Sequence, residues 1–266
     1  MVVRRVREHV ATHNWFAVSI DLLIVIIGVF IGMQVSNWNS ARIERNEVRA
    51  YRAQIVDDLI ANERELAERL HYYRQVRAHA LTAMEALEGG APRGEAFLVT
   101  SYQATQVSPI RMERSAYDEM IASGMAKSFA GPAVRRRLSS YYAGTERLET
   151  ASIYSTGYRD RIRREMRFAI QRRLRERCSD VIAISPDGLE TITLPERCNL
   201  DLPSAIVSRA ASDLSDIPEL EEELARHIGD LDVKIARFQQ WLRMARDTRQ
   251  SLERLEISRP TQGRLA

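Results

Sequence analysis

The feature that most constrains this chain is an apolar run close to its first residue. Residues 15–35 read WFAVSIDLLIVIIGVFIGMQV, and Asp21 is the one charged residue among these 21. A helix needs about 20 apolar residues to cross the hydrocarbon core of a bilayer. Trp15 and Trp38 lie 23 residues apart, about 35 Å along a helix at ~1.5 Å per residue, which is typical of aromatic anchors at two membrane interfaces. The run predicts a transmembrane helix over residues 15–38.

Two other interpretations of this run stay open. Its uncharged part, residues 22–35, is 14 residues long, the length of the apolar region in a cleaved signal peptide. No small-x-small cleavage site follows, because Gln34, Asn37 and Trp38 occupy that place. The third interpretation is a buried helix of a soluble protein. We favour the uncleaved span.

Basic residues leave the orientation of the span nearly undecided. The positive-inside rule counts Arg and Lys close to each end of a span. Three arginines lie on each side: Arg4, Arg5 and Arg7 before it, and Arg42, Arg45 and Arg49 after it. Their concentration in residues 1–14 mildly favours a cytoplasmic tail there, too short to carry a signalling output domain. We therefore expect residues 39–266 to form an extracytoplasmic domain.

The two cysteines support that orientation. Cys178 and Cys198 flank the one clear β signal, in which VIAI, SPDG and LETITL read as strand, turn and strand. If Ile184 lies opposite Leu189, the residue numbers of each cross-strand pair sum to 373. The numbers of the two cysteines sum to 376, so the cysteines are expected to lie close together at the open end of a hairpin of about residues 179–197. A disulfide is geometrically easy there and favours an oxidising compartment. Two unpaired thiols in a cytoplasmic loop are the alternative.

Two patches of sequence resemble a known family. Residues 28–39 read GVFIGMQVSNWN, and residues 116–124 and 138–142 read AYDEMIASG and LSSYY. They resemble an uncharacterised, domain-of-unknown-function family of bacterial single-span membrane proteins, whose Gly-rich helix ends in Gln-Val-x-Asn-Trp-Asn. Met120 stands where that family usually has Leu. The resemblance covers roughly residues 15–145 and implies a topology, but no activity.

The rest of the chain is patterned for helices. Apolar residues recur every three or four positions from Val48 to Leu87, until Gly89-Gly90-Ala91-Pro92 ends the pattern. We expect another long helix from Pro132 to about Arg177. The predicted fold class is therefore mostly α: a transmembrane helix that continues into an elongated helical bundle with one small β-hairpin.

A heptad pattern marks the C-terminal helix, expected over about residues 215–257. Its d positions are all apolar: Leu224, Leu231, Phe238, Ala245 and Leu252. The a positions hold Ile228, Ile235 and Leu242, and Arg249 interrupts the seam. Antiparallel packing against the first long helix within the chain is the simpler interpretation, and a coiled coil with a second chain is the alternative.

The predicted span carries two candidate features. Gly28, Gly32 and Ser36 are spaced by four residues, so they share one helix face on which another helix can approach closely. Such spacing also arises by chance in single spans. Asp21 lies about 9 Å inside Trp15 at ~1.5 Å per residue, where a carboxylate must pair, protonate or reach an interface. A partner-pairing role and an acid that reaches the headgroups both remain open.

An arginine-rich stretch is the strongest charge feature. Residues 159–177 hold nine Arg, two Glu and one Asp. Such a helix can bind lipid headgroups, an acidic protein or nucleic acid. We expect an internal partner instead, because acidic residues gather between Asp213 and Asp232.

No catalytic motif accompanies these features. The chain has no G-x-S-x-G, no phosphate-binding loop and no G-x-G-x-x-G, and His9 and His13 lack a third metal ligand. We expect no enzyme, no cofactor, no metal and no nucleic-acid partner. We expect a membrane-anchored interaction or scaffold protein whose partners are the bilayer and a second copy or another membrane protein. The alternative is an extracytoplasmic ligand-binding bundle, which a polar pocket between helices would favour.

Overall fold

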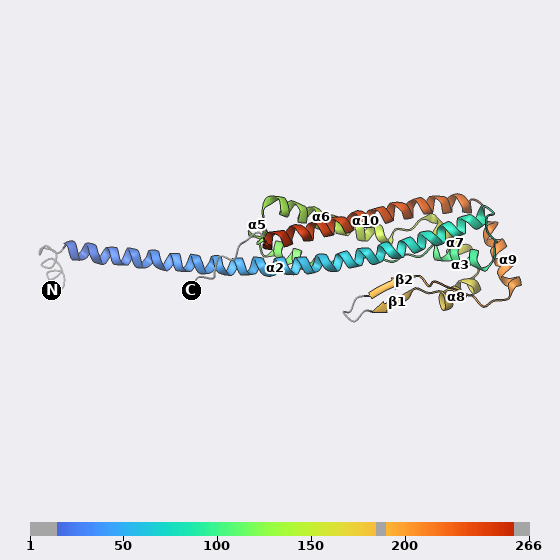
Figure 1. The fold of residues 1–266 in the computed structure, drawn as a ribbon, viewed down its shortest axis with the longest axis horizontal. Coiled ribbons are helices and arrows are strands. Elements are labelled where there is room, and N and C mark those ends of the chain that lie inside the picture. The colour runs from blue at the N-terminus through green and yellow to red at the C-terminus, as the bar shows by residue number, and fades with distance from the viewer. Residues whose placement is uncertain (1–14, 185–189, 258–266) are drawn as a thin grey trace, which may run out of the picture. The chain divides into compact units, whose positions relative to one another are not determined.

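The computed structural model describes residues 15–184 and 190–257 and is mostly α-helical, with one two-stranded sheet (Figure 1). The predicted fold class is confirmed. The chain divides into two compact units, Met1–Ala53 and Gln54–Ala266. The first helix, α2, spans Trp15–Leu87 and contributes to both units.

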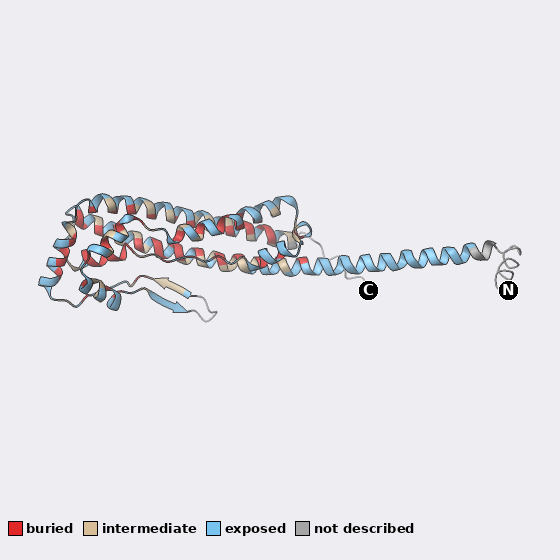
Figure 2. Cartoon of the chain, turned by 180° about the vertical axis from the view of Figure 1, so that it is seen from behind, coloured by how far each residue is buried: buried red, intermediate tan, exposed pale blue. Residues whose placement is uncertain are grey.

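In the first unit, residues 22–33 of α2 have apolar side chains on every face. Among its described residues from Ser19 on, the most apolar window has a mean hydropathy of 2.1 and none of it is buried. Figure 2 shows this apolar part of the helix exposed, whereas Val48 and Arg52 further along α2 are buried. By length and composition, it is long and apolar enough to cross a membrane.

The second unit is built around three long helical segments. α6 (Pro132–Ile153) packs on α10 (Leu220–Ile257), and the Gln54–Leu87 part of α2 contacts both through side-chain hydrogen bonds. Side-chain contacts between α2 and α10 have nearly constant residue-number sums, as an antiparallel pair requires: Arg77 with Asp232, Tyr73 with Phe238, and Glu63 with Arg249. The predicted antiparallel packing within the chain is therefore confirmed. The five apolar d positions of α10 are all buried.

Shorter helices surround this core. They are α3 (Glu95–Gln103), α4 (Ser115–Ala122), α5 (Ala126–Phe129), α7 (Gly157–Glu165), α8 (Phe168–Arg177) and α9 (Ser204–Ser215). The predicted continuous helix from Pro132 to about Arg177 is wrong. It ends at Tyr154 and again at Met166, where the backbone is extended with ψ of 133° and 125°. Its apolar residues at four-residue spacing are nevertheless buried: Ile162, Met166, Ile170 and Leu174.

The C-terminal helix begins later than predicted. α9 continues to Ser215, and α10 starts at Leu220 instead of about residue 215. Glu219 has a φ of 61°, a left-handed conformation that interrupts an α-helix. The turn between the two helices therefore occupies the positions expected for the first turn of α10.

The predicted hairpin is present, with its register shifted by one residue. β1 (Val181–Ile184) pairs antiparallel with β2 (Glu190–Thr193), so that Ile184 faces Glu190 and not Leu189. The predicted turn lies outside the described residues. Cys178 and Cys198 are bonded, with Cα atoms 5.3 Å apart, so the expected proximity of the cysteines is confirmed.

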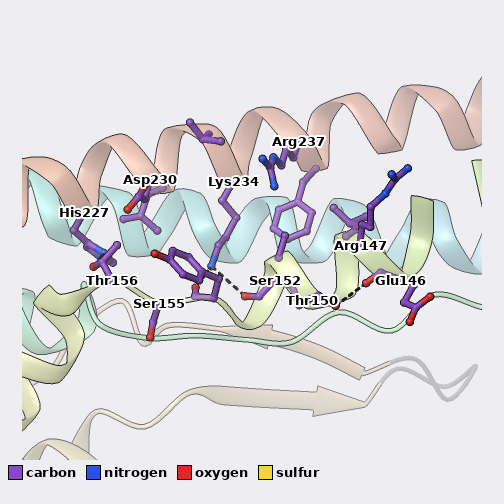
Figure 3. A pocket seen from close by; sticks show the side chains of 16 residues that line it. Glu146, Arg147, Thr150, Ser152, Ser155, Thr156, His227, Asp230, Lys234 and Arg237 are labelled. Carbon is purple, nitrogen blue, oxygen red and sulfur yellow. Dashed lines mark hydrogen bonds between the residues drawn. The ribbon is translucent and has the colours of Figure 1, made fainter. Parts of the chain in front are cut away.

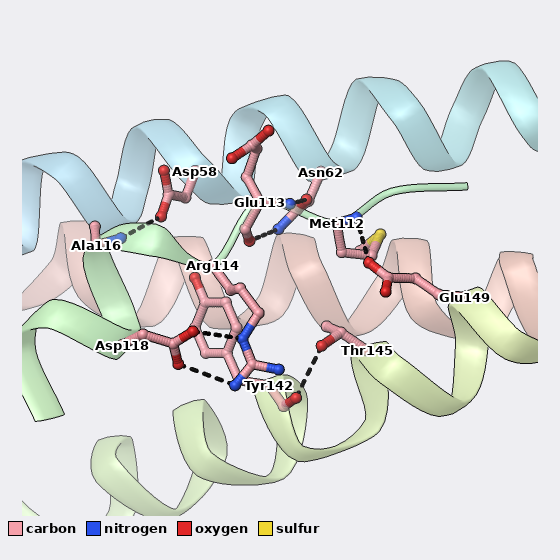
Figure 4. Close-up of polar contacts among 10 residues, drawn as sticks. All are labelled: Asp58, Asn62, Met112, Glu113, Arg114, Ala116, Asp118, Tyr142, Thr145 and Glu149. Carbon is pink, nitrogen blue, oxygen red and sulfur yellow. Dashed lines mark hydrogen bonds and ion pairs between the residues drawn. The ribbon is translucent and has the colours of Figure 1, made fainter. Parts of the chain in front are cut away.

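Polar side chains of α2 hold the irregular segment between α3 and α4 against the bundle (Figure 4). The side-chain amide of Asn62 donates to Glu113 O at 2.8 Å, and its oxygen accepts from Glu113 N–H at 2.7 Å. Asp58 accepts from the N–H of Ala116 in the first turn of α4. These side chains satisfy backbone groups that lack a helical partner.

Candidate ligand-binding cavity

A cavity of about 560 Å³ lies between α6 and α10 in the second unit (Figure 3). Its volume falls within the range of about 300–1,000 Å³ typical of small-molecule sites. The lining comes from the last turns of α6, the connection to α7, and the N-terminal half of α10. It lies where α6 ends at Ile153 and the backbone becomes extended.

The wall of the cavity is largely apolar. Leu148 on α6 and Leu231 and Phe238 on α10 line it and are buried. Leu231 and Phe238 are seam residues of the heptad pattern. Tyr154 and Val233 also line the cavity but are 61% and 53% exposed, so apolar surface continues from the interior to the mouth.

Lys234 is the central charged group of the lining. Its ammonium donates to Ser152 O at 3.1 Å and Tyr154 O at 2.8 Å, at the C-terminal end of α6. It also lies 4.5 Å from the ring centroid of Tyr73. A cation at a helix C-terminus is favourable because carbonyl groups there have no helical partner. Burial lowers the pKa of Lys234 to about 8, although Asp230 acts in the opposite direction.

His227 is fixed at one end of the cavity. Its Nδ1 lies 2.7 Å from the Thr156 hydroxyl and its Nε2 lies 2.8 Å from Ala104 O. A carbonyl only accepts, so Nε2 carries the proton and Nδ1 accepts from Thr156 in the neutral ring. The ring stacks on Tyr158 at 5.1 Å between centroids. Burial lowers the pKa of His227, which favours this neutral form.

Two guanidinium groups lie at the lining with no bond to other side chains. Arg147 on α6 and Arg237 on α10 are exposed, and neither makes a hydrogen bond or ion pair with any residue that the structure describes. Two acids also line the cavity, Glu146 and Asp230. Figure 3 shows these charged side chains distributed over both flanking helices.

This arrangement suits binding better than catalysis. The donors of Lys234 and both ring nitrogens of His227 are already engaged, so neither group offers a free lone pair to a substrate. Within residues 15–184 and 190–257, no cluster of three or more His, Cys, Asp or Glu side chains is placed to hold a metal ion.

The residues predicted from sequence for membrane association lie in the first unit, on α2. Gly28, Gly32 and Ser36 are exposed, as are Asp21 and Trp38. A Cβ built on either glycine would have no atom within 4 Å, which leaves that face open. Trp15 lies in α2, and its side chain is outside the described part. His9 and His13 are also outside it.

The arginine-rich stretch pairs internally, only partly as expected. Arg167 forms an ion pair with Asp213, one of the predicted acids. Arg173 and Arg177 instead reach Asp201, which the acidic cluster did not include. Other arginines in the stretch donate to carbonyl and amide oxygens: Arg159 to Thr105 O, Arg161 to Pro218 O, and Arg163 to Gln106 Oε1.

Sequence reasoning missed the cavity. The break at residues 154–156 forms one side of it, and a continuous helix was expected there. Thr156 was the available signal, because Thr is a favoured residue just before the first turn of a helix.

No protein-family model, curated protein or solved structure matches the chain. The family resemblance therefore stays a prediction. The second patch of that resemblance is part of the core: Met120, Leu138, Tyr141 and Tyr142 are buried, and Tyr117 stacks on Tyr142 at 4.2 Å. Gly124 has a φ of 76°, the left-handed conformation expected of a residue that ends a helix.

Proposed function

We propose that this chain is a membrane-anchored binding protein whose helical bundle takes up a small ligand between α6 and α10. The observation that carries the proposal is the cavity of about 560 Å³, because it combines a mostly apolar wall with a few fixed polar groups. This combination is typical of ligand sites. Lys234 and His227 position the backbone around the cavity and orient its polar groups.

The proposal is tested by asking whether the protein carries a ligand from its own membranes. Full-length protein in its native lipid is analysed by native mass spectrometry, alongside an Ala151→Phe variant that fills the cavity. A bound small molecule on the wild type and none on the variant is the expected result. Equal spectra from two folded proteins would contradict ligand binding at this place.

Membrane anchoring is supported by the exposure of the apolar part of α2. Apolar side chains are stable where water is excluded. No other part of the described chain covers these side chains of α2, so lipid is the environment that would exclude water from them. The disulfide supports a periplasmic bundle, since structural disulfides persist in oxidising compartments. A C-terminal alkaline phosphatase fusion tests the orientation: activity is expected, and a stable but inactive fusion would reverse it.

Association through the span is a second candidate function. It is supported by the open face of Gly28, Gly32 and Ser36, which nothing in the described chain covers. Small residues allow close helix approach in lipid, where packing rather than water exclusion drives association. A second copy or another membrane helix is the expected partner.

A reporter assay for transmembrane dimerisation tests this second function. Gly28→Ile with Gly32→Ile is expected to lower the signal at least severalfold. Leu23→Phe with Phe30→Trp adds bulk on the opposite face of the helix and serves as the control. Equal signals from both variants would remove a role for the small-residue face.

A further inference from the structure

We infer that the cavity between α6 and α10 takes a single-chain amphiphile with an anionic head, whose apolar body enters the cavity and whose head lies against Arg147 and Arg237. This inference rests on the proposed ligand-binding function and names the class of ligand.

The apolar surface is continuous from the interior to the outside. Leu148, Leu231 and Phe238 are buried in the wall. Tyr154 and Val233 are more than half exposed at the mouth. A ligand with an apolar chain would cover both sets of side chains and remove apolar surface from water. A fully polar ligand would leave this surface uncovered.

The charges of the lining divide into engaged and available groups. Lys234 is engaged with two carbonyls and an aromatic ring, and Asp230 lies within electrostatic range of it, so their opposite charges offset each other. His227 is held neutral by burial. Glu146 interacts electrostatically with Arg114, whose pKa it helps to raise, so its charge is shared with a cation outside the lining.

Arg147 and Arg237 remain as the available charges. They come from opposite helices and line the same cavity (Figure 3). Neither is paired within the part of the chain that the structure describes. A guanidinium presents a planar set of donors that matches the two oxygens of a carboxylate. An anionic head at the mouth is therefore the ligand group that these helices are equipped to hold.

The inference is tested with octanoate as the probe, titrated by calorimetry into full-length protein in nanodiscs of zwitterionic lipid. Octanamide and octylamine have the same chain with a neutral and a cationic head. Octanoate is expected to bind at least about tenfold more tightly than octanamide, the ratio for one charge-assisted hydrogen bond. Affinity is expected to rise about fourfold for each CH₂ added from hexanoate to octanoate.

Variants assign the two halves of the site. Arg147→Gln with Arg237→Gln is expected to bring octanoate affinity down to that of octanamide. Arg243→Gln, an exposed arginine elsewhere on α10, is the matched control and leaves it unchanged. Ala151→Phe is expected to abolish binding of every probe. Should that variant fail to fold, Thr150→Trp at the mouth replaces it.

The outcomes separate this inference from the function on which it rests. If octanamide or octylamine binds as tightly as octanoate, and Ala151→Phe abolishes that binding, the cavity binds ligands but not as an anion site, and the inference is overturned. If no probe binds above the level of empty nanodiscs, the inference also fails. The mass-spectrometric comparison then decides separately whether the cavity holds another class of ligand.

Discussion

The two parts of α2 have similar apolar residues in opposite environments. In the first unit, Leu22 and Phe30 are each 60% exposed, whereas Ile55 and Leu59 in the second unit are fully buried. The difference follows from sequence periodicity. Apolar residues surround the helix in the first part, while in the second they recur every three or four positions and form one face. A helix that is apolar all round needs lipid or another protein, and a helix with one apolar face needs only its neighbours in the bundle.

The largest effect is expected from charges in the middle of the exposed part. Ile26→Arg with Phe30→Arg places two arginines near the centre of the proposed span. Each costs about 2.5–3.5 kcal/mol on insertion scales, so the pair costs about 5–7 kcal/mol. The full-length variant is expected to leave membranes during an alkaline carbonate wash that retains the wild type.

The control for this experiment lies on the same helix. Leu81 is 42% exposed in the second unit, and Leu81→Arg is expected to leave membrane retention unchanged. If the double-arginine variant still sediments with washed membranes, the exposed part of α2 is not the anchor. The contrast between the two parts would then need another explanation.

Breaking the disulfide is expected to weaken the bundle without affecting the anchor. Cys178 and Cys198 close a loop with a sequence separation of 20, for which chain-entropy arguments give about 3 kcal/mol. Cys178→Ala with Cys198→Ala is expected to lower the free energy of unfolding of the bundle by roughly this amount, measured by urea titration with far-UV circular dichroism. Dithiothreitol lowers wild-type stability and leaves the variant unchanged. A parallel loss of membrane retention would contradict the independence of the two units.

A smaller effect is expected where Gly144 on α6 packs against Trp241 on α10. A Cβ at Gly144 would lie 2.2 Å from Cη2 of Trp241, so Gly144→Ala forces the indole to move. Overpacking costs about 1–3 kcal/mol, and the better helix propensity of Ala returns about 1 kcal/mol, so a net loss of about 1 kcal/mol in unfolding free energy is expected. Gly229→Ala on α10 has open space around its Cβ and is expected to gain about 0.5–1 kcal/mol. Equal changes in the two melting temperatures would exclude tight packing at Gly144.

The parts of the fold that follow from local periodicity were predictable. The end of α2 at Leu87, the burial of Leu224 and Leu231, and the proximity of the cysteines all follow from spacing along one element. The partner of Arg249 did not, because Glu63 lies 186 residues away in sequence. The heptad pattern shows that a charged residue, Arg249, lies at a seam position and needs a polar partner. It does not show which side chain is that partner.

The cavity was unpredictable for a related reason. It depends on a break in a helix at residues 154–156, and local propensity there is weak compared with tertiary contacts. Lys234 supplies such contacts, since it binds the carbonyls of Ser152 and Tyr154. Sequence alone places Lys234 on the C-terminal helix but does not bring it to the end of α6.

The smallest expected effect is a pH dependence from His227 within the bundle. Burial lowers its pKa below the ordinary value of 6.5, so below about pH 6.5 the unfolded chain takes up a proton that the folded chain resists. The free energy of unfolding therefore falls as pH decreases through 6.5, with a slope that approaches about 1.4 kcal/mol per pH unit. Asp58 and Asp180, whose pKa values are raised by burial, act in the opposite direction, so a variant must isolate the histidine.

His227→Gln provides that comparison, because glutamine can hydrogen-bond but does not titrate in this range. The variant is expected to be less stable at pH 7.5 and to lose less stability than the wild type between pH 7 and pH 5.5. Chemical denaturation at each pH measures the difference, which should reach up to about 1 kcal/mol. His71 is exposed, so His71→Gln is the matched control and should follow the wild-type curve. If the His227→Gln and wild-type curves stay parallel, protonation of His227 costs the fold nothing. The hydrogen bonds assigned to its neutral ring at the cavity would then be wrong.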